Sequence, residues 1–371
     1  MTLNSDAEQA RMLRDLSYRA IRLSRQKEYT QAEALFQQIL VQSQEKLGID
    51  NPNTMQSQLN LASCYMDQGK FEQAESLLQD VFDRSKRVWG ATHTFTERSL
   101  RKLAGCFTRQ GKYGPAIALY EQALNFHRQE LGDEHPQTTH IRCHLAEFYD
   151  ELGKYEQAEA LFQQSLAITR KVYGEDDSHM MADLNNLANL YVKQGKAAQA
   201  EPLFLQALTI LEKNSDANQS FLATCQNNLG RLYWEQSKYE QAESLLLNAL
   251  TLRQEIEGEE HHLTADTLNN LGLLFWKQGK YGQAEASYQQ ALAIYRKVVG
   301  TNHPHTARTL SNLAILYWEQ GKYTQGEAIF QEARTILQKT LGLDHPLTQT
   351  LLSNHAIIQQ KRQTRTSWWR F

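Results

Sequence analysis

Three arginines have the clearest potential for binding chemistry in this sequence. Arg101 and Arg109 follow Arg98 after 3 and 11 residues, which places all three on one face of a helix. Lys102 adds a fourth positive charge to this face. Because guanidinium groups bind carboxylates through paired hydrogen bonds, the pattern predicts a clamp for a carboxylate or an acidic peptide. The alternative is an ordinary charged helix face in contact with water.

Acidic side chains occupy the corresponding face of the next helical pattern. They are Glu147, Asp150 and Glu151. A groove lined by both sets of residues would be polarised along its length, with opposite charges at neighbouring places.

Asparagines recur at a fixed interval in the second half of the sequence. Asn185, Asn227 and Asn269 lie 42 residues apart, and each is followed directly by a second asparagine. An amide both donates and accepts hydrogen bonds, so these side chains could pair with the backbone of an extended peptide. The alternative, stronger for the second asparagine of each pair, is that the amides tie neighbouring helices together. We assign Asn189 and Arg231 to the same predicted groove.

Three tryptophans form a further periodic set, Trp234, Trp276 and Trp318. Each directly follows the aromatic residue that we expect in the core, such as Tyr233, so its side chain points about 100° away from the core stripe. An exposed aromatic stripe would anchor a partner. Packing between repeats is the other interpretation.

The histidines do not form a convincing metal site or catalytic set. Four of them recur at one position of a repeated loop, which favours a structural role: His93, His135, His303 and His345. The sequence contains no Ser-His-Asp order, no HExxH motif and no glycine-rich phosphate loop. It therefore predicts a non-catalytic protein without a metal or another cofactor.

All these residues belong to copies of one pattern, of which Leu268–Ala291 is typical. The copies fall into register at a shift of 42 residues, without insertion or deletion. A fixed period of roughly 20 to 50 residues is typical of a solenoid. The turn inside the repeat is Gly-Lys at residues 69–70, 111–112, 153–154, 195–196, 279–280 and 321–322, and Ser-Lys at 237–238.

Each copy contains two helical patterns and no alternating strand pattern. In one copy, Leu184, Leu187, Ala188 and Tyr191 share a helix face, and a second amphipathic segment begins near Ala200. Glycine in the turn permits a positive φ, and small residues on both segments let the helices approach closely. We therefore predict an all-α, right-handed superhelical solenoid of antiparallel helix pairs, with about eight repeats and a C-terminal capping helix.

The predicted boundaries follow the period. Residues 1–6 form a loose N-terminus, residues 7–363 a continuous solenoid, and residues 364–371 an aromatic tail. The repeats span about 7–50, 51–92, 93–134, 135–176, 177–218, 219–260, 261–302 and 303–344, followed by the capping helix at 345–363.

The pattern Leu-x-x-Leu-Ala/Gly-x-x-Tyr, then Gly-Lys-Tyr, then Ala-x-x-x-Phe-x-x-Ala resembles the tetratricopeptide repeat (TPR), which is normally about 34 residues long. The 42-residue period and the LG-x-x-HP loop are similar to the long repeats of kinesin light chains, over about residues 10–360. No heptad coiled coil accompanies them, so we expect a stand-alone array. The resemblance implies that the first helices line a concave, peptide-binding groove. It does not imply transport.

Bulk properties narrow the class of partner. The formal net charge is −3, so no general attraction to nucleic acid or to a membrane is expected. The four cysteines have no metal-binding spacing, and the N-terminus lacks an apolar signal core. These features predict a cytoplasmic protein with reduced cysteines.

The leading functional hypothesis is a scaffold that binds a peptide or protein segment in its groove, with an acidic segment as one option. The alternative is a regulatory sensor that binds a small ligand or signal peptide and changes conformation. The tail contains Trp368, Trp369 and Phe371, which suggests docking on the array or self-association; a frayed terminus is the simpler interpretation.

Overall fold

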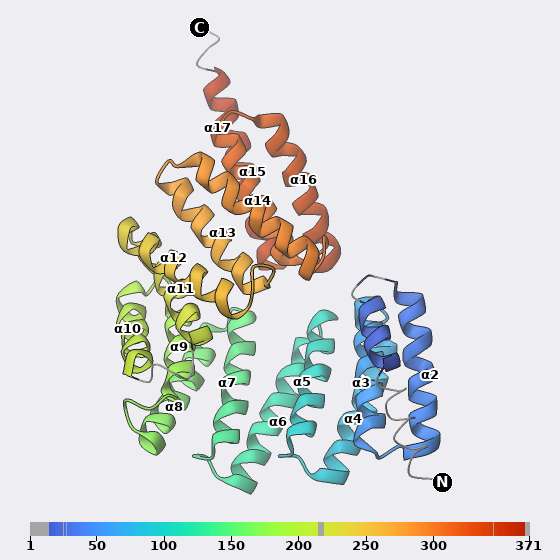
Figure 1. Cartoon of the computed structure of the whole chain (residues 1–371). Helices are drawn as coiled ribbons and strands as arrows, with labels where there is room; N and C mark the ends of the chain where they lie inside the picture. Colours follow the sequence, from blue (N-terminus) through green and yellow to red (C-terminus); the bar gives the residue numbers. More distant parts are fainter. Residues whose placement is uncertain (1–14, 25, 27, 214–218, 344, 368–371) are drawn as a thin grey trace. The chain divides into compact units, whose positions relative to one another are not determined.

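Each half of the repeated pattern forms one helix, as the spacing of its apolar residues predicts (Figure 1). The computed structural model describes residues 15–24, 26, 28–213, 219–343 and 345–367, and these ranges contain no strand. The first helices of the repeats are α3 (Pro52–Asp67), α5 (Thr94–Arg109), α7 (Pro136–Glu151), α9 (Met180–Lys193), α11 (Gln219–Glu235), α13 (His262–Lys277), α15 (Pro304–Glu319) and α17 (Pro346–Ser367). The second helices are α2 (Tyr29–Leu47), α4 (Phe71–Trp89), α6 (Tyr113–Leu131), α8 (Tyr155–Tyr173), α10 (Ala197–Lys213), α12 (Tyr239–Ile256), α14 (Tyr281–Val298) and α16 (Tyr323–Thr340).

The chain divides into two compact units. The N-terminal unit is Met1–Val172 and the C-terminal unit is Tyr173–Phe371. Within each unit, a helix packs mainly against the helix before it and the helix after it in the sequence. The core is therefore a row of similar small cores, such as the buried set Ala265, Leu268, Ala291 and Tyr295.

The two helices of a repeat meet where a small residue faces a large one. A Cβ atom added to Gly230 would lie 2.9 Å from Leu246, and one added to Gly272 would lie 2.5 Å from Tyr288. The first helices α3, α5, α7, α9 and α15 have a fully or almost fully buried alanine at this position, such as Ala104. The predicted close approach of the two helices is thus confirmed.

The Gly-Lys turn ends the first helix in a repeated geometry. Gly195 has a φ of 71°, and the N–H of Lys196 donates to the carbonyl of Tyr191 at 2.8 Å. Glycine adopts this left-handed conformation without the Cβ penalty of other residues. Ser237 is the exception, with a φ of 62° in a non-glycine residue.

Proline and histidine mark the start of most first helices. Proline occupies the first turn of α3, α7 and α15, where its missing N–H is not needed. The ring Nδ1 of His303 accepts the N–H of His305 at 3.2 Å, so this histidine acts as the N-cap. The same cap is made by His93, His135, His261 and His345.

A polar clamp connects the second helices α2, α4, α10, α12 and α14 to the turn of the next repeat. The carboxylate of Glu33 accepts hydrogen bonds from Lys70 Nζ at 2.7 Å and from Gln68 Nε2 at 2.9 Å. These hydrogen bonds lower the pKa of Glu33. The lysine–glutamate pair recurs with the same spacing at Lys112–Glu75, Lys238–Glu201, Lys280–Glu243 and Lys322–Glu285.

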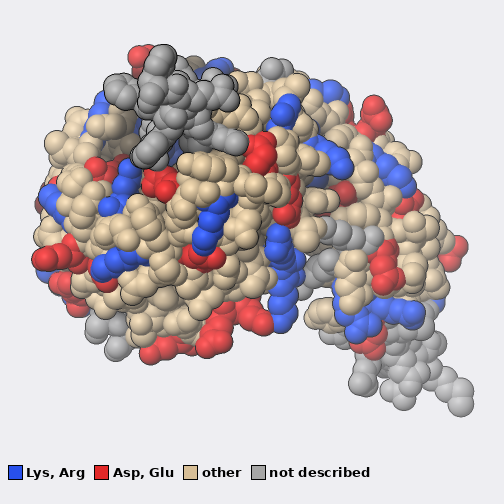
Figure 2. Space-filling model, turned by 90° about the horizontal axis from the view of Figure 1, so that it is seen from above, with Lys and Arg blue, Asp and Glu red and all other residues tan. Residues whose placement is uncertain are grey.

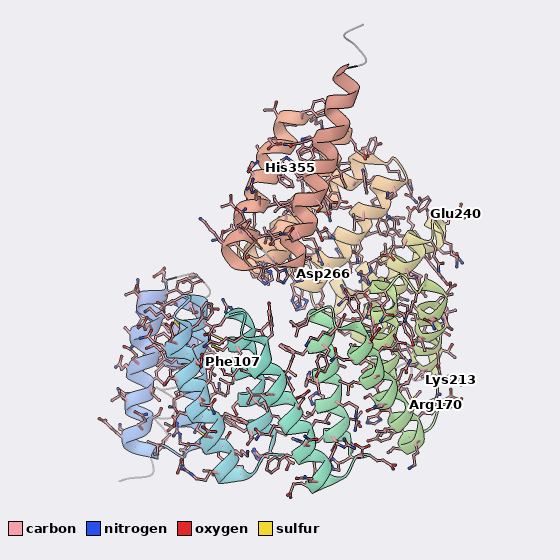
Figure 3. The ribbon with its side chains drawn as sticks, turned by 180° about the vertical axis from the view of Figure 1, so that it is seen from behind. Phe107, Arg170, Lys213, Glu240, Asp266 and His355 are labelled. Atoms are coloured by element: carbon pink, nitrogen blue, oxygen red, sulfur yellow. The ribbon has the colours of Figure 1, made fainter. Side chains whose placement is uncertain are left out.

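The last helix covers the end of the C-terminal unit. His355 on α17 stacks on Phe330 at 3.9 Å between ring centroids and on Trp318 at 5.1 Å (Figure 3). This agrees with the expected capping helix. Residues 1–6 and the aromatic side chains of the tail lie outside the described residues.

We predict that Ser237→Gly stabilises the protein by about 0.5–1 kcal/mol, because it removes the left-handed strain of a residue with a Cβ atom. Gly195→Ser is the matched control and should destabilise by a similar amount. Urea unfolding followed by circular dichroism measures both. A lower urea midpoint for Ser237→Gly would contradict the strain argument.

We further predict that acid weakens the cap at α15. Burial, then the neighbouring His305, lowers the pKa of His303, and Asp266, His262 and Arg308 also face it. Since the folded-state pKa lies below the unfolded value of about 6.5, the stabilisation is present above that pH and is lost as the pH falls.

Asparagine caps helices without titrating, so His303→Asn should reduce this pH dependence. The measurement is urea unfolding at about pH 7.5 and about pH 5.5, on either side of the histidine pKa. The difference in stability between the two pH values should be smaller in the variant than in the wild type. Equal differences would exclude His303 as a source of acid sensitivity.

Candidate functional site

Two neighbouring first helices of the N-terminal unit, α5 and α7, border a partly open hollow of about 320 Å³. Both helices present residues spaced by three or four positions, as one helix face requires. The lining residues are Arg101, Ala104, Gly105, Thr108 and Arg109 from α5, His144, Glu147, Phe148 and Glu151 from α7, and Tyr120 from α6.

The rim of this hollow carries both signs of charge. Arg101 and Arg109 are exposed on the α5 side, and Glu147 and Glu151 are exposed on the α7 side. The structure thus brings together two of the predicted arginines and two of the predicted acidic residues. Arg109 also lies 3.5 Å from Asp67, a distance typical of a weak surface ion pair.

The floor of the hollow is aromatic. Tyr120 and Phe148 are both 7% exposed, and their ring centroids are 5.9 Å apart. Burial raises the pKa of Tyr120 to about 12, so its phenol stays neutral. His144 lies beside them, with Nδ1 3.0 Å from Glu147 Oε2, while its Nε2 is buried without a hydrogen-bond partner.

The other two basic residues of the predicted clamp do not line the hollow. Arg98 is exposed, its guanidinium lies 4.7 Å from the ring centroid of Phe95, and it donates a hydrogen bond to Gln56. Lys102 donates to Ser63 Oγ at 2.8 Å, and burial lowers the pKa of Lys102. The four charges therefore do not act as a single clamp, because side chains of α3 engage Arg98, Lys102 and Arg109.

The asparagines form a ladder between first helices of the C-terminal unit. Asn228 Nδ2 donates to Asn185 Oδ1 at 3.0 Å, and the same bond joins Asn270 to Asn227 at 3.0 Å. A third bond joins Asn312 to Asn269 at 3.1 Å. Each rung connects one repeat to the next.

This ladder corrects the prediction that these amides bind a peptide backbone. Asn185, Asn227 and Asn269 are only 7%, 6% and 2% exposed, and each Oδ1 already accepts a hydrogen bond from the next repeat. The structural interpretation is therefore favoured for both asparagine positions. Asn189 is half-buried and takes no part in the rungs.

The tryptophans do not form a uniform exposed stripe. Trp318 is 7% exposed, and its indole stacks on Phe330 and donates to the carbonyl of Tyr323 at 3.2 Å. Gly326 makes room for it, since an added Cβ atom would lie 2.6 Å from the indole. The hypothesis of an exposed anchor is wrong for Trp318.

The other two tryptophans are half-buried, and each differs from Trp318. Trp276 Nε1 donates to Glu319 Oε2 at 2.7 Å. Trp234 Nε1 is buried without a hydrogen-bond partner. Arg231, one helical turn earlier, is also half-buried with an unpaired Nε, and burial lowers its pKa. These residues belong to the C-terminal unit and are separate from the α5–α7 hollow.

Sequence reasoning missed several residues of the site. The sequence analysis did not single out Tyr120, Phe148 or Gly105 as residues of the site. The available signal was Gly105, because glycine stands there at a helix position where other repeats have a side chain. A second hollow of about 440 Å³, lined by Leu124, Leu161 and neighbours on α6, α7 and α8, was also not expected.

The described residues contain neither a metal-binding cluster nor a membrane-spanning helix. No group of three or more histidine, cysteine or carboxylate side chains among them could hold a metal ion. No helix in the described ranges combines the length and apolar character needed to cross a bilayer. Basic and acidic side chains are interspersed on the face in view in Figure 2.

The helix pairs, their turns and the small-to-large contacts agree with a known family model. A tetratricopeptide repeat model matches residues 8–87, 54–129, 95–171, 138–213, 179–254, 221–297, 277–325 and 305–366. The chain belongs to the tetratricopeptide repeat family. TPR arrays are in general non-catalytic scaffolds for protein–protein interaction, and they bind peptide or protein partners. No curated protein matches this chain.

Several solved structures are similar to this TPR chain. A TPR protein from Parabacteroides merdae shares 18% identity, covers 81% of this chain and 97% of its own, and has a TM-score of 0.51. The apo form of RapI shares 16% identity, with coverage of 78% and 99% and a TM-score of 0.51. Both show the fold alone.

A protein named after kinesin light chains and BtubC (BKLC) are also among the structural neighbours. One is a structure of nearly identical TPR-like repeats from Podosopora anserina, named after a kinesin light chain. It shares 25% identity with this chain, covers 56% of this chain and 98% of its own, and has a TM-score of 0.44. BtubC (BKLC) from P. vanneervenii shares 22% identity, with coverage of 73% and 92% and a TM-score of 0.40.

We predict that Asn270→Ala destabilises the protein by about 1–3 kcal/mol, because it leaves the buried Asn227 Oδ1 without a donor. Asn60→Ala is the matched control, since Asn60 occupies the same helix position but bonds only to Gln56 on its own helix. Thermal unfolding should show the larger loss for Asn270→Ala. Equal losses would mean that the ladder does not stabilise the repeats.

Proposed function

We propose that this TPR chain is a scaffold that binds an extended segment of a partner protein on the first-helix face of its N-terminal unit. The α5–α7 hollow is the anchor of that site. The observation that supports this most strongly is the combination of an aromatic floor with exposed arginines on one side and exposed glutamates on the other. Recognition sites commonly combine buried apolar contacts with a polar rim.

The size of the hollow favours a chain segment over a folded surface. A volume of about 320 Å³ accommodates a large side chain, but not a helix or a sheet. Helix faces of neighbouring repeats lie roughly 10 Å apart, so an extended segment that crosses them meets both charged sides within a few residues. The partner is therefore expected to be an unstructured or extended region.

The charges refine the expected partner. A carboxylate would pair with Arg101 or Arg109, and a cation would pair with Glu147 or Glu151. A purely acidic segment would bring negative charge against the two glutamates. The site is thus better matched to a segment of mixed charge than to the acidic segment considered from the arginines alone.

The regulatory sensor remains an alternative hypothesis. A small-ligand sensor would be favoured by an enclosed pocket, whereas the α5–α7 hollow is partly open. The cytoplasmic location of the protein and its self-association through the C-terminal tail also remain predictions.

The test is selection from a random peptide library displayed on phage, with the full chain as bait. Selected peptides should lose about tenfold or more in affinity for Arg101→Glu and for Glu147→Lys, because each variant reverses a charge on the rim. Lys46→Glu is the control, since Lys46 is exposed on α2, a second helix of the same unit. Peptides that bind both rim variants as tightly as the wild type would refute the proposed site, as would a selection that yields no binders.

A further inference from the structure

Gly105 has no structural reason to be glycine. It lies inside α5 with an ordinary helical φ, and a Cβ atom added there would meet nothing within 4 Å. Glycine is among the poorest helix formers, so a helix interior gains stability from almost any other residue. Gly230 and Gly272 differ from it, because an added Cβ atom would collide with the paired helix at either of these positions.

The same helix position carries a side chain in the other repeats. The residues are Ile21, Ser63, Glu147, Asn189, Arg231, Leu273 and Ile315. Only the repeat that contains α5 leaves this place empty, and Gly105 lines the α5–α7 hollow. The missing side chain therefore provides part of the space above Tyr120 and Phe148.

His144, which also lines the hollow, carries an unpaired polar atom. His144 Nε2 is buried and has no hydrogen-bond partner. Since a carboxylate only accepts hydrogen bonds, the contact of His144 Nδ1 with Glu147 makes Nδ1 the donor.

We infer that Gly105 creates a specificity subsite that takes a large apolar side chain of the partner, flanked in the partner sequence by one acidic and one basic residue. This inference rests on the proposed function and names the segment that it would bind. Alternate residues of an extended segment share a face and are about 6.8 Å apart, so an acid and a base two positions before and after the apolar residue span about 13 Å. That span reaches both sides of the hollow.

The subsite differs from a general attraction to charged chains. The apolar side chain enters the space over Tyr120, the acidic residue faces Arg101 and Arg109, and the basic residue faces Glu147 and Glu151. Either order of the two charges along the segment satisfies this arrangement, and the preferred order reports the direction in which the segment runs.

The test uses synthetic fluorescent peptides with Asp, Phe and Lys at alternate positions, in both orders, separated by serine and glycine. In the comparison peptides, Phe is replaced by Gly, or Lys by Asp. The wild-type chain should bind one order at least about tenfold more tightly than its Phe→Gly version. The peptide with two acids should bind more weakly than the peptide of mixed charge.

Gly105→Leu fills the subsite and should abolish the preference for Phe. Its thermal midpoint should equal or exceed that of the wild type, because leucine is a better helix former and its Cβ atom meets no atom. Gly114→Leu is the matched control: Gly114 is exposed on α6, an added Cβ atom also meets nothing, and it does not line the hollow. This variant should keep the preference for Phe.

Three results would overturn the subsite: no measurable binding of either peptide order, no preference for Phe in the wild type, or a preference that survives in Gly105→Leu. The proposed function is judged separately. If library-selected peptides still depend on Arg101 and Glu147, the binding face stands and only the Gly105 subsite fails.

Discussion

The close approach of two helices at one small residue is the constraint on which the rest of this structure depends. Gly272 meets Tyr288, and Gly230 meets Leu246, at distances that leave no room for a Cβ atom. Because a large side chain on one helix fills the space left by a small one on the other, each repeat closes in the same way. The same rule explains Gly326 on the second helix α16, because the indole of Trp318 fills the space that a Cβ atom at this position would occupy.

With the pairing fixed, the first-helix face is free to differ between the two units. In the C-terminal unit, the Asn185, Asn227 and Asn269 amides are buried in an inter-repeat ladder. In the N-terminal unit, the position of these amides is occupied by Leu59, Arg101 and Cys143. Where the ladder is missing, charged side chains and an open hollow take its place. The same helix positions therefore hold structural amides in one unit and residues of the proposed binding face in the other.

The fold could be predicted from the sequence because its signals are local and repeated. The turn at Gly195, the cap at His303 and the buried alanines each depend on a few neighbouring residues, and the 42-residue period repeats them. The clamp between Glu33 and Lys70 could also have been predicted, because the Ala-Glu and Gly-Lys pairs recur 37 residues apart in the sequence. It was missed because the contact crosses from one repeat to the next.

The sequence by itself determined the all-α repeat architecture and the helix face on which Arg101 and Glu147 lie. Only the tertiary structure decided which side chains on that face are exposed to solvent and which are buried. The periodic patterns that contain Trp318 and Asn269 resemble those of exposed residues. Neighbouring repeats nevertheless bury both side chains. Periodicity fixes the direction of a side chain from its own helix, whereas burial depends on the volume and polarity of the helix packed against it. For the same reason, the empty place at Gly105 became visible as a hollow only when α5, α6 and α7 were assembled.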